Sequence, residues 1–186
     1  MENFAINLVY RDVIQSWRFE DLALCRGVMD SEYLDVQEYF FLPGGIELIC
    51  NDHFIFFQSF DYYDVLDCVS FLLDTLSVAG VYKGDIAHEN LNEARLKNTS
   101  KDLLIFLNLE NGSIKLSYKN NSQFVSRNNF YFDEIILQTQ LWINACKVAL
   151  DEYFKVTKRI LDGFENKDKE SILRKYLHEW EQFSLR

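Results

Sequence analysis

Residues 103 to 118, "LLIFLNLENGSIKLSY", restrict the fold more than any other part of this chain. Two alternating runs flank the dipeptide Asn111-Gly112. This dipeptide tolerates the left-handed backbone that a tight turn requires, and it is the strongest hairpin signal that a short sequence can carry. The sequence therefore predicts two antiparallel strands of a sheet here.

Further strand patterns surround this hairpin. Three β-rich runs are separated by the turn signals "PGG" and "ND", and they predict an antiparallel meander. The runs are "VQEYFFL" (36–42), "IELIC" (46–50) and "FIFFQSF" (54–60). The segment "QFVSRNNFYF" (123–132) predicts another hairpin. At the N-terminus, Phe4, Ile6 and Leu8 alternate as in a strand, whereas "VYRDVIQSW" also fits a helix, so both interpretations stay open.

A central helix is predicted from about Asp61 to Val78, because its apolar residues fall on one face at 100° per residue. Asp61 suits the N-cap and Asp64 the third helical position, where backbone amides lack partners. The polar segment "HENLNEARLKNTSKD" (88–102) predicts a surface connection between this helix and the hairpin.

Two helices are predicted at the C-terminal end. Asp133 fits the cap of a long helix that runs to about Asp162, ahead of Gly163. A last helix is predicted from about Lys167 to Phe183. Its apolar stripe consists of Ile172, Leu173, Tyr176, Leu177 and Trp180.

Strands that cluster ahead of the final helices are typical of the α+β class. We therefore predict an antiparallel sheet, built from a meander and hairpins, that packs with a central helix and two C-terminal helices (about 133–183). The 186 residues suffice for one domain, 1–186, which buries roughly 70% of its unfolded surface.

Acidic residues dominate the first half of the chain. The formal net charge is −10; residues 1–89 hold 16 acids against four bases, and residues 90–186 hold 13 against 15. Between Arg26 and Lys83, 56 consecutive residues contain ten acids and no lysine or arginine. This acidic window (27–82) is either a solvated face or a surface for a basic partner, which would relieve its self-repulsion. Its sign disfavours nucleic acid as a direct ligand.

The acidic window also holds the residues that we expect at an interface. Twelve aromatic residues lie in it, and tyrosines beside carboxylates are typical of interface anchors. Asp67 and Asp74 lie seven residues apart and project, with Ser70, away from the apolar stripe of the central helix. The predicted partner-binding residues are Asp67, Asp74, Tyr63, Asp64, Asp35, Glu38 and Tyr39.

Motifs for catalysis or metal binding are missing from the sequence. The four cysteines form no CxxC pair and are expected to be buried free thiols. "HEWEQ" (178–182) lacks the second histidine of a zincin helix, and no GxSxG, Walker-type loop or GxGxxG occurs. Asp61, Asp64 and Asp67 turn around the helix rather than converge on a metal. We expect no cofactor, no metal and no enzymatic activity.

The N-terminus "MENFAINLVYRDV" carries an acid at position 2 and lacks a basic n-region, so no signal peptide is predicted. No apolar run is long enough to span a bilayer. A cytoplasmic protein without membrane association is the expectation.

The acidic window, together with the hairpin "LLIFLNLENGSIKLSYKN" and the junction "FYFDEIILQTQLWINACKVALDEYF" that leads into a long helix, resembles the bacterial immunity proteins of polymorphic-toxin and contact-dependent growth inhibition systems. The resemblance covers about half the chain. It implies a cytoplasmic protein that binds a cognate toxin domain, often a basic nuclease, and blocks its active site or substrate surface.

Two other classes of function stay open. A small enzyme with an unrecognised carboxylate or histidine site would show a concave pocket lined by such residues. A homo-oligomeric adaptor, for instance a homodimer through the C-terminal helices, would show a large apolar patch on residues 133–183.

Overall fold

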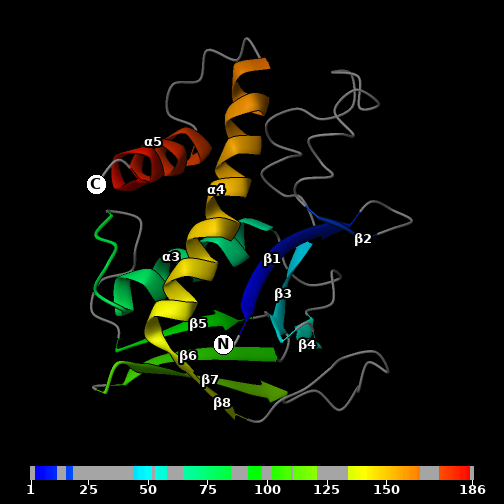
Figure 1. Cartoon of the computed structure of the whole chain (residues 1–186). Coiled ribbons are helices and arrows are strands. Elements are labelled where there is room, and N and C mark those ends of the chain that lie inside the picture. The colour runs from blue at the N-terminus through cyan, green and yellow to red at the C-terminus, as the bar shows by residue number, and fades with distance from the viewer. Residues whose placement is uncertain are drawn as a thin grey trace.

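The computed structural model describes residues 3–11, 16–18, 44–51, 53–57, 65–84, 92–97, 102–109, 111–120, 134–163 and 172–184. These residues form two four-stranded antiparallel sheets and three helices, so the predicted α+β class is confirmed (Figure 1). No helix within the described ranges combines the length and the hydropathy needed to cross a bilayer.

The first sheet has the strand order β2-β1-β3-β4. Its strands are β1 (Phe4–Arg11), β2 (Ser16–Arg18), β3 (Gly44–Cys50) and β4 (His53–Phe57). The alternation of Phe4, Ile6 and Leu8 is confirmed as a strand, since all three are buried along one face of β1. Of the segment that also fitted a helix, residues 9–11 and 16–17 belong to β1 and β2, and residues 12–15 lie outside the described residues. The predicted hairpin between β3 and β4 is confirmed, and Asn51 adopts a φ of 50° in its turn. Residues 36–42 of the predicted meander lie outside the described residues; the other neighbour of β3 is β1.

The second sheet has the order β5-β6-β7-β8. Its strands are β5 (Glu93–Lys97), β6 (Asp102–Leu109), β7 (Ser113–Asn120) and β8 (Glu134–Gln138). The hairpin predicted at Asn111-Gly112 is confirmed: Leu109 pairs with Ser113, and Gly112 has a φ of 75°. This left-handed conformation favours glycine, which explains the residue at this position. The hairpin predicted at 123–132 lies outside the described residues.

Two predictions about this sheet are wrong. The segment predicted as a surface connection contains β5, because Ala94 and Leu96 alternate toward the core and are buried within an otherwise polar sequence. The long helix does not begin at Asp133, because residues 134–138 pair with β7 as β8 and bury Leu137. No glycine or proline separates β8 from the helix, so the sequence carries no mark of this junction.

The central helix, α3 (Val65–Val78), ends as predicted. Gly80, with a φ of 76°, follows it, and the amides of Gly80 and Val81 donate to the carbonyls of Ser77 and Leu76. These two bonds form a Schellman motif, which satisfies carbonyls at the helix end. The expected caps, Asp61 and Asp64, lie outside the described residues.

The C-terminal helices are α4 (Thr139–Gly163) and α5 (Ile172–Ser184). The end of α4 at Gly163 matches the prediction. On α5 the predicted stripe is correct for Leu173 and Trp180, which are buried, and for Tyr176 and Leu177, which pack against the core. It is wrong for Ile172, which is half exposed because it stands at the first residue of the helix.

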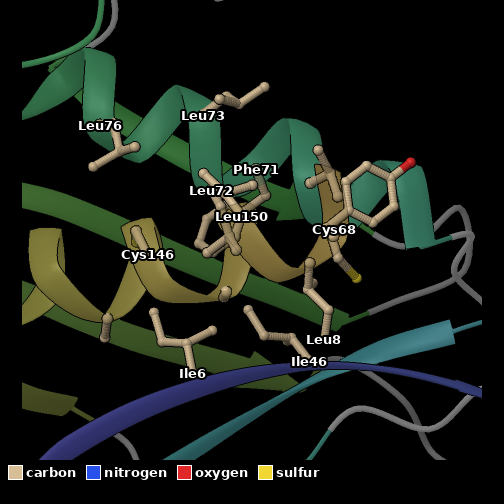
Figure 2. Packing of buried hydrophobic residues seen from close by; sticks show 14 of the residues in the cluster. Ile6, Leu8, Ile46, Cys68, Phe71, Leu72, Leu73, Leu76, Cys146 and Leu150 are labelled. Carbon is tan, nitrogen blue, oxygen red and sulfur yellow. The ribbon is translucent and has the colours of Figure 1, made fainter. Parts of the chain in front are cut away.

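Helices α3 and α4 pack against strands of both sheets and so join them. α5 packs on α4, and in Figure 1 it lies on the opposite side of α4 from β1. Figure 2 shows Ile6, Leu8 and Ile46 pointing from β1 and β3 toward the helices, where they meet side chains such as Leu72 and Leu150.

Trp142 of α4 occupies the junction of these layers and is fully buried. Its ring centroid lies 5.7 Å from that of Phe4 on β1, 6.5 Å from Phe71 on α3 and 5.3 Å from Phe106 on β6. The indole Nε1 donates a hydrogen bond of 2.9 Å to Thr75 Oγ1, and Thr75 donates to the carbonyl of Leu72 at 2.7 Å. The ring therefore contacts side chains from both sheets, and its buried indole nitrogen keeps a hydrogen-bond partner.

We expect Thr75→Val to lower the free energy of unfolding by about 1–3 kcal/mol, because the isosteric change removes the hydroxyl oxygen that accepts the buried indole N–H of Trp142. Urea denaturation measures the loss. In a Trp142→Phe background the same substitution should cost less, since no indole N–H remains to be satisfied. An equal cost in both backgrounds would show that the hydrogen bond is unimportant.

Candidate functional site

Two of the predicted partner-binding residues lie in the described part of the chain, both on α3. Asp67 is exposed in the first turn, and Asp74 is half-buried two turns later. Both carboxylates also interact with neighbouring residues of the fold. Tyr63, Asp64, Asp35, Glu38 and Tyr39 lie outside the described residues.

The face of α3 that carries Asp67, Ser70 and Asp74 meets α5. The hydroxyl of Tyr176 lies 2.9 Å from Ser70 Oγ, although 106 residues separate the two in sequence. The carboxylates of Asp67 and Asp74, together with Glu179 of α5, act electrostatically on the same hydroxyl. We call Asp67, Ser70, Asp74, Tyr176 and Glu179 the acidic junction. Its α3 half was predicted from sequence; its α5 half was missed, because Tyr176 was assigned only to an apolar stripe.

The pKa of Tyr176 is raised above its ordinary value. Burial of the phenol is the main cause, because it disfavours the phenolate. The negative charges of Asp74, Glu179 and Asp67 act in the same direction, while the hydrogen bond with Ser70 opposes them. Tyr176 is therefore a neutral hydroxyl at ordinary pH, placed among three carboxylates.

This raised pKa predicts a loss of stability at high pH. A folded-state pKa above the unfolded value of about 10 contributes stability that is fully present below that value and is lost as pH rises through the folded pKa. The stability difference between the native protein and Tyr176→Phe should therefore shrink above about pH 10. Urea denaturation of both proteins at a series of pH values measures it, and a difference that does not change with pH would contradict the assignment.

A second feature is a pocket of ≈ 390 Å³ between the segment after α3 and the end of α5. Its lining consists of Val81, Tyr82, Lys83, Gly84, His178, Glu179, Gln182 and Phe183. Tyr82 donates a hydrogen bond of 2.9 Å to Glu179 Oε2 across it. Glu179 thus belongs to both the pocket and the acidic junction.

The close approach of Gly84 shapes this pocket. A Cβ atom at position 84 would overlap the Tyr82 hydroxyl oxygen and would lie 2.6 Å from Glu179 Oε2, so a side chain there would displace the hydrogen-bonded pair. One carboxylate of the pocket, that of Glu179, is fixed by its hydrogen bond from Tyr82, and the exposed side chains of Lys83 and His178 also line the pocket. Sequence reasoning did not find this pocket, because its two halves lie about a hundred residues apart.

The described part of the chain contains neither an activated thiol nor a cluster of metal ligands that would form a third candidate site beside the acidic junction and the pocket. Cys68 and Cys146 are buried free thiols as predicted, and burial raises the pKa of Cys146, which disfavours its reactive thiolate. Cys50 is half-buried, and Cys25 lies outside the described residues. No group of three or more histidine, cysteine or acidic side chains within the described ranges is arranged to hold a metal ion.

The large apolar patch expected for an oligomeric adaptor does not stand out among the described residues of 133–183. The exposed large apolar side chains there are Ile136, Val148 and Ile172, which lie on β8, α4 and α5 respectively. Single exposed apolar residues are common on monomeric proteins.

Comparison with known proteins finds no match: no family model, no curated protein and no solved structure matches this chain.

Proposed function

We propose that this protein is an immunity-type inhibitor that binds and neutralises a cognate basic toxin domain, such as a nuclease, in the bacterial cytoplasm. The observation that carries the proposal is the acidic window, in which ten acids and no lysine or arginine occupy 56 consecutive residues. A surface of this sign attracts a cationic protein at long range and repels nucleic acid, which the partner would otherwise bind.

The acidic junction is the part of this surface for which we can name contacts. Asp67 is exposed, Asp74 is half-buried, and Glu179 extends the negative charge onto α5. Tyr176 adds an aromatic ring with a polar tip, a type of side chain that is enriched at the centres of interfaces. Carboxylates would steer the partner, and the ring would contribute to the buried contact.

The test is inhibition of a purified partner. We would take the candidate toxin domain from the product of a neighbouring gene, and we expect it to be basic. Titration of the toxin domain with the protein should abolish its activity at a fixed stoichiometric ratio, and the two should elute as one complex. A basic neighbouring product that neither binds nor loses activity would contradict the proposal.

The pocket at the end of α5 supports a second candidate, a small enzyme. His178 and Glu179 both line it, and a histidine and a carboxylate can serve as acid and base. Hydrolysis or transfer on a generic substrate panel that His178→Ala abolishes would favour this candidate, while equal background rates in both proteins would remove it.

A further inference from the structure

Two opposite charges line the pocket between the segment that follows α3 and the C-terminal half of α5 (Figure 1). Glu179 contributes a carboxylate and Lys83 an ammonium group, yet no ion pair joins these two described side chains. A ligand with a single positive charge would be repelled by Lys83, and a ligand with a single negative charge would be repelled by Glu179. The pocket is therefore complementary to a ligand that carries both charges.

The carboxylate of Glu179 is held in place before any ligand arrives. Its Oε2 atom accepts a hydrogen bond of 2.9 Å from Tyr82, whose side chain is buried, and Gly84 leaves room for this pair because it has no Cβ atom. Its Oε1 atom lies 4.0 Å from Lys175 Nζ, which is longer than a hydrogen bond. Oε1 can therefore accept a donor from a ligand, at a low cost in ordering.

An apolar wall adjoins the charged groups. The ring of Phe183 lies with its centroid 5.4 Å from that of Tyr82 and 5.1 Å from that of Trp180, so its position is fixed by packing. Val81, also in the lining, is 39% exposed. The volume of ≈ 390 Å³ is near the lower end of the range of roughly 300–1,000 Å³ for small-molecule sites. The pocket therefore suits a small molecule with an apolar part.

We propose that this pocket binds a small zwitterion whose ammonium and carboxylate groups are separated by an apolar spacer, as in an ω-amino acid. The ammonium group donates to Glu179 Oε1, and the carboxylate accepts from Lys83. The spacer packs against Val81 and Phe183. A spacer is required because Lys83 and Glu179 do not pair, so the ligand must reach from one to the other. The site does not depend on the proposed function, since its ligand is not the toxin domain.

An NMR titration of the full chain with 6-aminohexanoate tests the site. Binding should saturate in the millimolar range or below, with amide shifts at residues 81–84 and 178–183. The analogue 6-aminohexanamide lacks the negative charge, and 6-acetamidohexanoate lacks the positive charge. Each should bind at least about tenfold more weakly, because each loses one charge-assisted interaction. The absence of saturable binding by 6-aminohexanoate, or equal binding by either analogue, would overturn the proposal.

Substitutions assign each charge of the ligand to its partner. Lys83→Met should remove the preference for 6-aminohexanoate over 6-aminohexanamide, and Glu179→Gln should remove the preference over 6-acetamidohexanoate. Lys155→Met on α4 and Glu181→Gln on α5 delete the same charges outside the pocket lining and should change neither preference. Lys83 is exposed, so its substitution leaves the fold intact and decides the test even if Glu179→Gln destabilises the protein. A preference that persists in Lys83→Met would contradict the assignment.

Discussion

The double substitution Asp67→Lys with Asp74→Lys is expected to slow association with the cognate toxin domain by about 10- to 100-fold. Both carboxylates stand in the acidic junction, and the change reverses the local field that would steer a basic partner. Stopped-flow or surface plasmon resonance measurements of the association rate at low salt give the result. Circular dichroism checks that the variant keeps its helices.

A matched control separates this face from net charge alone. Glu152→Lys with Asp162→Lys reverses two exposed acids on α4 and changes the net charge by the same amount. We expect a much smaller effect from it, because these residues lie outside the acidic window. If both double variants slow association equally, the acidic junction has no special role in binding.

Truncation of Trp142 to alanine should lower the free energy of unfolding by about 3–5 kcal/mol. The ring is fully buried against aromatic side chains from β1, α3 and β6, so its loss opens a cavity where both sheets meet the helices. In a chain of this size, such a loss lowers Tm by on the order of 10 °C. Thermal unfolding followed by circular dichroism measures it.

Trp180→Ala is the matched control, since it removes the same buried side chain from α5. Its effect on the main transition should be smaller, because the cost cannot exceed the free energy with which α5 docks. Equal losses from the two substitutions would mean that α5 unfolds only together with the sheets, contrary to this expectation.

The sequence predicts the larger elements of this fold and misses the smaller ones for a physical reason. Asn111-Gly112 and the apolar stripe of α3 carry local signals, because turn geometry and helical periodicity are local properties. β5 and β8 have five residues each, and pairing with β6 and β7 stabilises them. That pairing depends on residues distant in sequence, so tertiary context overrides weak local preference.

The candidate site divides in the same way. Helical spacing places Asp67, Ser70 and Asp74 on one face, and that much follows from the sequence. The approach of Tyr176 and Glu179 depends on how α5 packs on α4, which no local pattern encodes. Folding also brings a cation to the junction, since Lys175 Nζ lies 4.0 Å from Glu179. The acidic window contains no lysine or arginine, but in the folded protein Lys175 reduces the negative charge at the acidic junction.

The dependence of the association rate on ionic strength tests the central claim most directly. Between about 0.01 M and about 1 M salt, the Debye length falls from about 30 Å to about 3 Å, which removes long-range attraction between exposed charges. If the acidic surface steers a basic toxin domain, its association rate with this protein should fall steeply across that range, while the Asp67→Lys, Asp74→Lys variant should show a flatter dependence. An association rate that stays constant from low to high salt would contradict the account.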